Sequence, residues 1–493
     1  MNELLKAPTP HLVEAPPEAR GPLARLRASH WSALPVLLAG TFLIVLDFFI
    51  VNVALPSMQT ELHATTTMIE WVVAGYGLTF AVLLLAAGRF GDRWGRRRLF
   101  AIGVGTFTVA SAVCGVAPNA TVLVVARLAQ GAAAALISPT VLAIIGVVYT
   151  GKDRARAIGM YATVMGLAAA GGQLIGGLLL SANIAGLGWR TVFLINVPVG
   201  IVALLATPKF VPESREARPA RTDVVGLVLA TVGVTALILP LLEGRQEGWP
   251  VWTWVSLAAA PLFLVEFALR QRALVRRAEA PLLDPRLFRS RSFTAGLVAQ
   301  FALWGGQASY FLILALFLQE GRGLSALQSG LVFTIVAAAY LIGSAKAPAL
   351  SARYGRTVVT AGAVLLAVGH LALVLATTEV GVGGSVFTLA PGLLFAGVGM
   401  GLCITALTTT VLSDADPQQA GAVSGALSSV QQIGNAVGVA VIGLIFFGGL
   451  GSGYAHAFDM SLIALAGLLG VLAVLSRFLP RKDTAVAETG IAA

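Results

Sequence analysis

Two charged residues lie inside long apolar segments of the sequence. Asp47 follows VLLAGTFLIVL, and Arg127 follows TVLVVA. A carboxylate in such surroundings is costly unless it pairs, faces a cavity or takes up a proton. A guanidinium keeps its charge and therefore needs an acid, carbonyl groups or water beside it. A carboxyl that must release a proton before it holds a cation can couple proton entry to the exit of another compound. For each residue, a purely structural role in helix packing is the alternative.

Neutral amides and aromatic rings gather in other apolar segments. Gln300 and Gln307 flank a pair of glycines, and Gln431, Gln432 and Asn435 lie within about one helical turn. Uncharged amides can hold a substrate without fixing its charge, although a single aromatic residue is more often lipid-facing or core. We predict an amphipathic substrate cavity lined by Phe48, Phe49, Asn52, Tyr76, Gln130, Gln300, Trp304, Gln307, Tyr340, Gln431, Gln432 and Asn435.

The composition requires a bilayer around most of the chain. Of the 493 residues, 57% are hydrophobic and 11% are charged, whereas a soluble domain carries roughly 25% charged residues. The net charge of +10 could suggest nucleic acid, but the basic residues are few and stand in short connections between apolar runs. Cys114 and Cys403 lie in apolar stretches, so we expect small core residues, no disulfide and no metal site.

The apolar segments predict an all-α integral membrane protein. A membrane-spanning helix needs roughly 20 mainly apolar residues. About fourteen such segments are present, centred near residues 44, 80, 108, 134, 168, 199, 234, 262, 306, 337, 368, 399, 434 and 469.

Arginine and lysine set the expected orientation. Alternate connections are basic, and basic connections stay on the cytoplasmic side. The rule places both termini in the cytoplasm of a bacterial-type cytoplasmic membrane. The basic connections carry, in order, Arg20, Arg25 and Arg27; Arg93 and Arg96 to Arg98; Lys152, Arg154 and Arg156; Lys209, Arg215, Arg218 and Arg221; residues 270–291; Arg353 and Arg356; and Arg481 and Lys482.

An internal repeat divides the chain. Trp94-Gly95-Arg96 after the second span recurs as Tyr354-Gly355-Arg356 after the tenth, and repeated halves are common in transporters. Two six-helix bundles of pseudo-symmetric halves, with two helices inserted between them, account for fourteen spans. The expected divisions are a tail at 1–33, a bundle at 34–208, the inserted pair with its flanking loops at 209–292, a second bundle at 293–480 and a tail at 481–493.

Five motifs resemble the fourteen-helix drug:proton antiporter branch of the major facilitator superfamily. They cover the first, fourth, fifth and sixth helices and the loop between helices two and three. Together with the repeat, the resemblance extends from about Pro35 to Arg481. The motifs are LDFFIVNVALP at 46–56, GRFGDRWGRRR at 88–98, RLAQGAAAALISP at 127–139, GLAAAGGQLIGG at 166–177 and WRTVFLINVPVG at 189–200.

The resemblance implies roles for three groups of residues. It implies proton coupling at Asp47 and Arg127, and a bistable gate at the cytoplasmic loop. It also implies a packed hinge on the fifth helix that favours exchange over uniport. The gate residues are Gly91, Asp92, Gly95 and Arg96, and the hinge residues are Gly166, Gly171, Gly172, Gly176 and Gly177.

The chain departs from the pattern of that branch at three positions. Phe49 stands where Thr is usual, Gly172 where Pro is usual, and Gln431 where Arg is common. Ala352 replaces the loop acid in the second half, so the gate is predicted to be one-sided. These changes bear on the substrate class and on coupling rather than on the fold.

Two further titratable residues have conventional interpretations. Glu70, beside Trp71, is predicted to anchor the chain at the outer interface, and His370 is predicted to make a satisfied hydrogen bond.

The sequence predicts a proton-coupled antiporter that exports small amphipathic, hydrophobic or cationic drugs by alternating access. No GxxxxGK[ST] pattern is present, so the proton gradient rather than ATP is the expected energy source, with no cofactor. Neither a nucleophile–His–acid spacing nor a metal-ligand cluster is visible, which disfavours an enzyme. The alternatives are a dedicated exporter of one metabolite or antibiotic, a proton-coupled importer, and a membrane-embedded enzyme or receptor.

Overall fold

The computed structural model describes residues 30–215, 222–277, 279–413 and 420–479, and these residues form helices and connections without a strand. Both predicted tails lie almost wholly outside the described residues. The first half contains α2 (Ala33–Glu61), α3 (Thr66–Trp94), α4 (Arg96–Gly115), α5 (Ala120–Val148), α6 (Gly151–Ala182), α7 (Thr191–Leu194) and α8 (Asn196–Phe210).

Two further helices, α9 (Val224–Glu243) and α10 (Val251–Arg276), connect the halves and pack on each other. The second half contains α11 (Arg291–Leu316), a π-helical turn η5 (Phe317–Gly321), α12 (Ala326–Tyr354), α13 (Thr357–Val380), α14 (Ala390–Ser413), α15 (Ala420–Gly449) and α16 (Tyr454–Leu475).

The predicted number of spans agrees with these helices. Thirteen helical segments of the described chain are long and apolar enough to cross a bilayer, among them the α7–α8 segment. Helix α6 supplies the fourteenth as a pair of segments, Gly151–Ala169 and Gly171–Ala182, bent by 41°. The prediction of an all-α, fourteen-helix membrane protein is confirmed.

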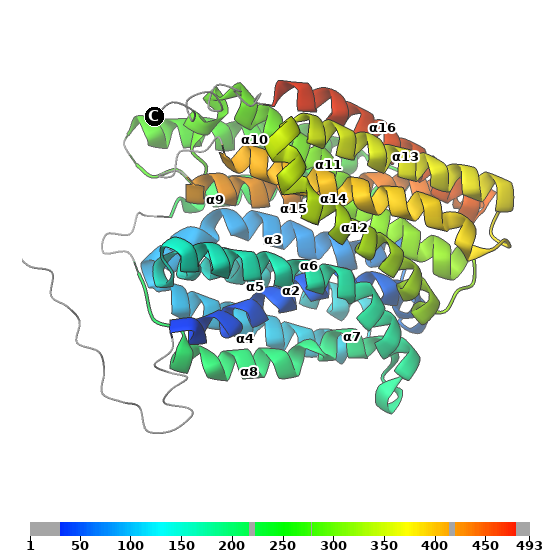
Figure 1. Cartoon of the computed structure of the whole chain (residues 1–493), viewed down its shortest axis with the longest axis horizontal. Helices are drawn as coiled ribbons and strands as arrows, with labels where there is room; N and C mark the ends of the chain where they lie inside the picture. The colour runs from blue at the N-terminus through cyan, green and yellow to red at the C-terminus, as the bar shows by residue number, and fades with distance from the viewer. Residues whose placement is uncertain (1–29, 216–221, 278, 414–419, 480–493) are drawn as a thin grey trace, which may run out of the picture.

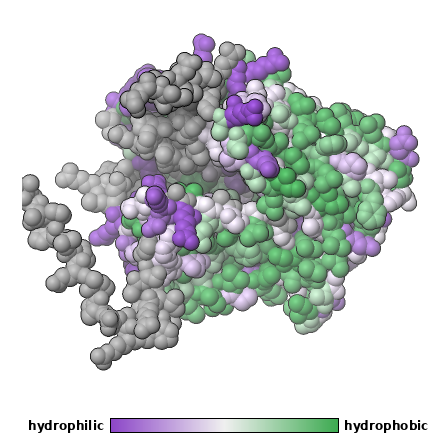
Figure 2. All heavy atoms as spheres, in the orientation of Figure 1, coloured by the Kyte–Doolittle hydropathy of each residue, from purple (hydrophilic) through white to green (hydrophobic). Residues whose placement is uncertain are grey.

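Helices of the two halves run side by side along the long axis of the molecule. In Figure 1 the helices from α2 to α8 occupy the lower part of the view, and α11, α13 and α16 occupy the upper part. The halves meet where α3 packs on α15 and where α6 packs on α12. Figure 2 shows hydrophobic residues over most of the visible surface, with hydrophilic residues gathered mainly towards its ends.

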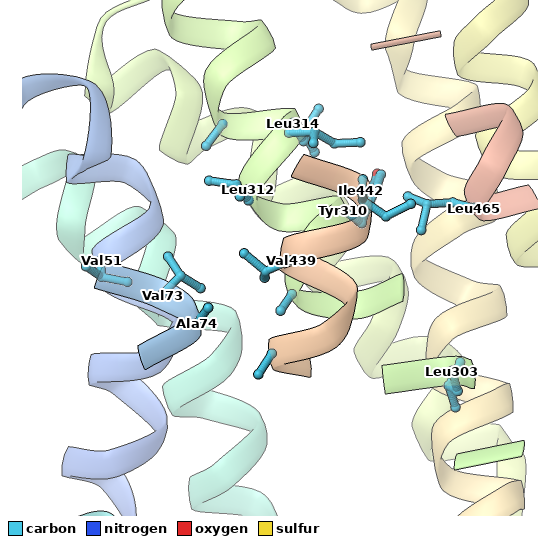
Figure 3. Packing of buried hydrophobic residues seen from close by; sticks show 14 of the residues in the cluster. Val51, Val73, Ala74, Leu303, Tyr310, Leu312, Leu314, Val439, Ile442 and Leu465 are labelled. Carbon is cyan, nitrogen blue, oxygen red and sulfur yellow. The ribbon is translucent and has the colours of Figure 1, made fainter. Parts of the chain in front are cut away.

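One hydrophobic core continues across the contact between the halves. Val73 and Ala74 of α3 belong to the same buried cluster as Val439 and Ile442 of α15 and Tyr310 of α11. Figure 3 shows Val73 and Ala74 lying opposite Val439. The contact is therefore mainly apolar, a surface that can separate without breaking many hydrogen bonds.

The glycines of α6 differ in what they contact. A Cβ at Gly172 would lie 2.9 Å from Cβ of Phe49, and one at Gly176 would lie 2.9 Å from Cγ1 of Ile50, both on α2. A Cβ at Gly177 would lie 2.6 Å from the carbonyl oxygen of Ala326 on α12. These three glycines allow α6 to pack closely on α2 of its own half and on α12 of the second half, as small residues do between membrane helices.

The other two predicted hinge glycines do not share this role. At Gly166 the nearest neighbour of an added Cβ is Leu341, at 3.7 Å, and at Gly171 it is Ile175 of the same helix, at 3.4 Å. The tight packing expected of the hinge is therefore found at Gly172, Gly176 and Gly177 but not at this pair, and the hinge role of the five glycines stays a prediction.

The described contacts between the halves include several at the ends predicted to be external. Besides Gly177 and Ala326, the Gln319 side chain donates to the carbonyl oxygen of Val53 (3.0 Å). A Cβ at Gly330 of α12 would lie 2.8 Å from the carbonyl oxygen of Gln173 of α6. The structure thus has the two halves joined on this side.

Asp223 fastens the inserted helices to each other at their predicted cytoplasmic end. It caps α9 by accepting from the Gly226 amide (2.9 Å), and it accepts from Arg270 (2.7 Å) and Gln271 (2.9 Å) of α10. Burial acts to raise the pKa of Asp223, but these hydrogen bonds outweigh burial and hold the pKa below its ordinary value.

Replacing Gly177 by valine is expected to force α6 away from α12, because the added Cβ meets the backbone of Ala326 rather than a movable side chain. We expect a loss of about 1–3 kcal/mol in the free energy of unfolding in detergent, the usual cost of overpacking a tight contact. Gly171→Val is the matched control and should change the free energy of unfolding by less than about 0.5 kcal/mol. Equal losses in the two variants would contradict the assignment of the close contact to Gly177.

Candidate functional site

Asp47 and Arg127 form an ion pair inside the first half. Asp47 lies at the middle of α2 and Arg127 on the second turn of α5, and both are 0% exposed. The Arg127 Nη1 atom donates to Oδ2 of Asp47, and its Nε atom donates to the carbonyl oxygen of Val72 on α3 (2.8 Å). Asp47 and Arg127, which were predicted as two separate residues, are thus in direct contact. Through the carbonyl of Val72 the pair also connects to a third helix.

Two amide side chains complete the surroundings of the carboxylate. Gln130, one turn after Arg127, donates to Oδ1 of Asp47 (3.1 Å), and Asn196 at the start of α8 donates to the same oxygen (2.8 Å). Gln130 also accepts from Arg127 (3.0 Å) and donates to Oγ of Ser111 on α4 (2.8 Å). Side chains from α2, α4, α5 and α8, together with a carbonyl of α3, thus form one polar network.

The network holds one negative and one positive charge away from water. Removing one member of a buried ion pair leaves the other uncompensated, which is strongly unfavourable. Protonation of Asp47 has the same electrostatic effect, since it neutralises the partner of Arg127 while both stay buried.

Tyr76 and Gln130 belong to this network rather than to a cavity lining. The Arg127 guanidinium lies 4.4 Å from the centre of the Tyr76 ring, and the Tyr76 hydroxyl donates to the carbonyl oxygen of Ile44 (3.3 Å). Both Tyr76 and Gln130 are 0% exposed. Their assignment to the substrate cavity is wrong, because their polar atoms point to neighbours within the first half.

A second polar cluster forms in the other half around Gln300 of α11. Its Nε2 atom donates to Oγ1 of Thr408 on α14 (3.1 Å), and its Oε1 atom accepts from Trp304 (2.9 Å) and from Gln431 of α15 (3.2 Å). Asn435 donates to Gln432 one turn earlier on α15 (3.3 Å). Of the predicted amides, Gln300 of α11 and Gln431 of α15 are therefore in direct contact.

The aromatic residues of α2 reach the second half. The ring centres of Phe49 and Phe311 of α11 are 5.3 Å apart, and the Phe48 ring lies edge-on to Phe49 at 5.2 Å. Asn52 donates to the Phe48 and Phe49 carbonyls (3.4 and 3.2 Å), whereas its buried Oδ1 has no described partner. Phe49 thus stands at the contact between the halves, where a substrate path would run.

Gln307 does not join the amide cluster. It lines a small enclosed space of about 10 Å³ inside the second half, together with Tyr310 and His370. The prediction of a hydrogen bond for His370 is wrong. Neither ring nitrogen has a partner among the described residues, and the centre of the ring lies 4.8 Å from that of Tyr310. Tyr340 of α12 is half-buried, with a hydrogen bond to Ser344 one turn later.

The predicted gate loop packs against the segment that follows α8. Gly95 ends α3 with a φ of 97°, a conformation that favours glycine, and donates to the carbonyl oxygen of Gly91 (3.0 Å). The Arg96 amide donates to the carbonyl oxygen of Ser214 (2.8 Å), and the Arg97 amide donates to the Glu213 carboxylate (3.0 Å). The side chain of Asp92 lies outside the described residues, so the gating role stays a prediction.

Sequence reasoning missed Asn196, Ser111 and Thr408 as members of these clusters. Asn196 lies within the quoted WRTVFLINVPVG motif, where it is the one amide in an otherwise mostly apolar run. That isolation was a usable signal. Ser111 and Thr408 carried none, because small hydroxyl residues are common in membrane helices and bond to their own backbone.

Fourteen helices in two halves around paired polar clusters define a membrane transporter. The family model of the Major Facilitator Superfamily matches residues 37–439, and the chain belongs to this superfamily. It is therefore a transporter rather than an enzyme, and it handles small molecules within the membrane.

The chain is similar to several curated proteins of actinobacteria. It is 39% identical to a "Probable actinorhodin transporter" of Streptomyces coelicolor, over 86% of this chain and 74% of that one. It is 35% identical to the "Multidrug resistance protein Stp" of Mycobacterium tuberculosis, over 82% and 74%. A crystal structure of a POT family transporter with 5-aminolevulinic acid matches 90% of this chain and 94% of that one, with a TM-score of 0.68 at 14% identity, which shows the fold alone.

Separate and joint removal of the charges should reveal the ion pair. We expect Asp47→Asn and Arg127→Gln each to destabilise the protein by about 3 kcal/mol, because each leaves one buried charge without a partner. The double variant should lose clearly less than the sum of the two. The measurement is a double-mutant cycle of unfolding in detergent, and strictly additive losses would contradict a direct buried pair.

Proposed function

We propose that the chain is a proton-coupled efflux antiporter that exports small amphipathic compounds. The observation that carries the proposal is the fully buried pair of Asp47 and Arg127, the only ion pair among the described residues in which both partners are almost wholly inaccessible. Several relatives of the chain are named for drug resistance or for export, which supports the same direction of transport.

Proton binding at Asp47 would act through α2. That helix carries the carboxylate on one side, and close by it carries Phe49, which touches Phe311 of the second half. It also packs closely on α6 through Gly172 and Gly176. A proton on Asp47 would release Arg127, and a small shift of α2 would then alter both contacts with neighbouring helices. Interfaces of this kind adopt one packed arrangement or another rather than intermediate ones.

The groups available to a substrate are neutral. The amides of Gln431 and Gln432 and the rings of Phe49 and Trp304, all half-buried, offer hydrogen bonds and apolar area without a fixed charge. Such a lining suits amphipathic molecules of varied charge. The proposed cytoplasmic-membrane location with both termini inside places this lining between the cytoplasm and the exterior, with the proton gradient as the energy source and no cofactor or nucleotide.

Export of one antibiotic is the second candidate. Several relatives carry the name of a single compound, such as the "Tetracenomycin C resistance and export protein" of Streptomyces glaucescens, at 32% identity over 87% of this chain. The interlinked amides around Gln300 form a fixed arrangement of donors and acceptors, which would also suit one rigid aromatic substrate.

Proton exchange can be measured in inverted vesicles that hold a pH-reporting dye and an imposed proton gradient. We expect lipophilic cations or neutral antibiotics to collapse the gradient with wild-type protein. Asp47→Asn should reduce the initial rate at least about a hundredfold, because the coupling carboxyl is gone. Collapse limited to one antibiotic would favour the dedicated exporter.

Asp223→Asn is the matched control, since Asp223 is also a buried carboxylate paired with an arginine but lies at the inserted helices. It should keep the wild-type rate within about twofold. Gradient collapse that survives in Asp47→Asn would overturn the proposed role of this carboxyl, provided that the variant elutes as a folded protein.

A further inference from the structure

Glu70 is a buried carboxyl at the contact between the two halves. It lies on the second turn of α3, is 2% exposed, and its Oε1 atom has no hydrogen-bond partner among the described residues. The prediction of an interfacial anchor is therefore wrong for Glu70. Trp71 beside it is half-buried and donates to the Glu243 carboxylate of α9 (2.8 Å).

The second half provides space for this carboxyl. Gly443 of α15 faces Glu70 so closely that a Cβ on Gly443 would overlap its Oε1 atom. The carboxyl thus occupies a place that the absence of a side chain on α15 creates. It lies in the stretch where α3 and α15 pack, at the ends of these helices predicted to be external.

The charged groups around Glu70 are engaged elsewhere. On α9, Glu243 accepts from Trp71, and Arg245 just beyond its end donates to Thr66 (3.0 Å) and covers the Phe447 ring at 5.3 Å. These two are the charges whose fields reach Glu70, and they oppose each other.

The other helices that pack on α3 offer Glu70 no charge to pair with. The segment of α15 from 426 to 449 contains no charged residue. Arg127 of α5 is paired with Asp47 of α2, and Glu61 at the end of α2 is paired with Arg190.

An ionised carboxylate in this place would be buried without an ion-pair partner and with one oxygen lacking any donor, which is unfavourable. A neutral carboxyl has no such penalty. Separation of α3 from α15 would expose the same group to external water, where it would ionise. Its protonation is therefore linked to whether the halves are in contact on this side.

We propose that Glu70 must take a proton from the external side before the halves close there, and that it returns this proton to external water when they reopen. Glu70 is thus a positioning residue of the transport cycle rather than a carrier of the transported proton, which stays with Asp47. The inference rests on the proposed antiport and deepens it. At low external pH Glu70 would be protonated, and the external side would then close after the transported proton has entered from that side.

The test measures external opening directly. Spin labels are placed at His63→Cys before α3 and Ser452→Cys after α15, both exposed positions, while the native Cys114 and Cys403 are fully buried. Label distances are recorded on the full chain in lipid nanodiscs from about pH 5.5 to about pH 8.5, without substrate. We expect the population with the longer distance to rise at least about threefold with pH in the wild type.

Four variants separate Glu70 from other titrating groups. Glu70→Gln, which imitates the protonated carboxyl, should keep the short distance at every pH. Glu70→Asp, which keeps a titratable carboxyl, should retain a pH dependence. Glu243→Gln, a neighbouring carboxyl, and Asp223→Asn, a buried carboxyl at the predicted cytoplasmic end of the inserted helices, should each retain the wild-type dependence. A wild type without pH dependence, or a Glu70→Gln variant that keeps it, would overturn the proposal.

Failure here is distinguishable from failure of the antiport proposal. The distance measurement needs neither substrate nor gradient, whereas the vesicle measurement tests Asp47 through proton flux. Substrate-driven proton flux together with a pH-independent distance would reject only the role of Glu70.

Discussion

The cost of an unpaired charge inside the bilayer is the constraint on which the first half of the molecule depends. Asp47 and Arg127 are both inaccessible, so each must find its partners within the protein. Those partners come from different helices: the amides of Gln130 and Asn196 and the carbonyl of Val72. The pair therefore fixes how α2, α3, α5 and α8 sit around one another.

Contacts between the halves follow a different principle. There the contact between α3 and α15 is mainly apolar, and α6 approaches α2 and α12 through glycines. Such surfaces gain their stability from close packing rather than from directional bonds. They can part and re-form without leaving many polar groups unsatisfied. The proposed opening and closing would therefore take place at this boundary.

The fold was predictable from the sequence because apolar length and the placement of arginine report directly on membrane spans. Asp47 and Arg127 could be chosen as candidate site residues for a related reason, since a charge within an apolar run is unfavourable unless it has a partner or a function. The hydrogen-bond and packing partners of the site residues were not predictable from the sequence. Nothing in the local sequence shows that Gln130 bonds to Asp47, that a side chain at Gly171 would meet only Ile175 of its own helix, or that Gln307 lies apart from Gln300. These facts depend on helix rotation and tertiary packing, which the spacing of residues along one chain does not specify.

The inserted helices can be assigned to one half by the kind of contact they make. At its external end α9 is tied to α3 by directional bonds: Thr67 donates to the carbonyl of Leu242 (3.3 Å), and Trp71 donates to Glu243. Towards α15 the polar contact is the guanidinium of Arg245 over the ring of Phe447. A cation–π contact tolerates sliding better than a set of hydrogen bonds does, because it has no single acceptor atom. When α3 and α15 separate, α9 should therefore move with α3. The inserted pair then belongs mechanically to the first half, with α9 forming one wall of the space that Glu70 occupies.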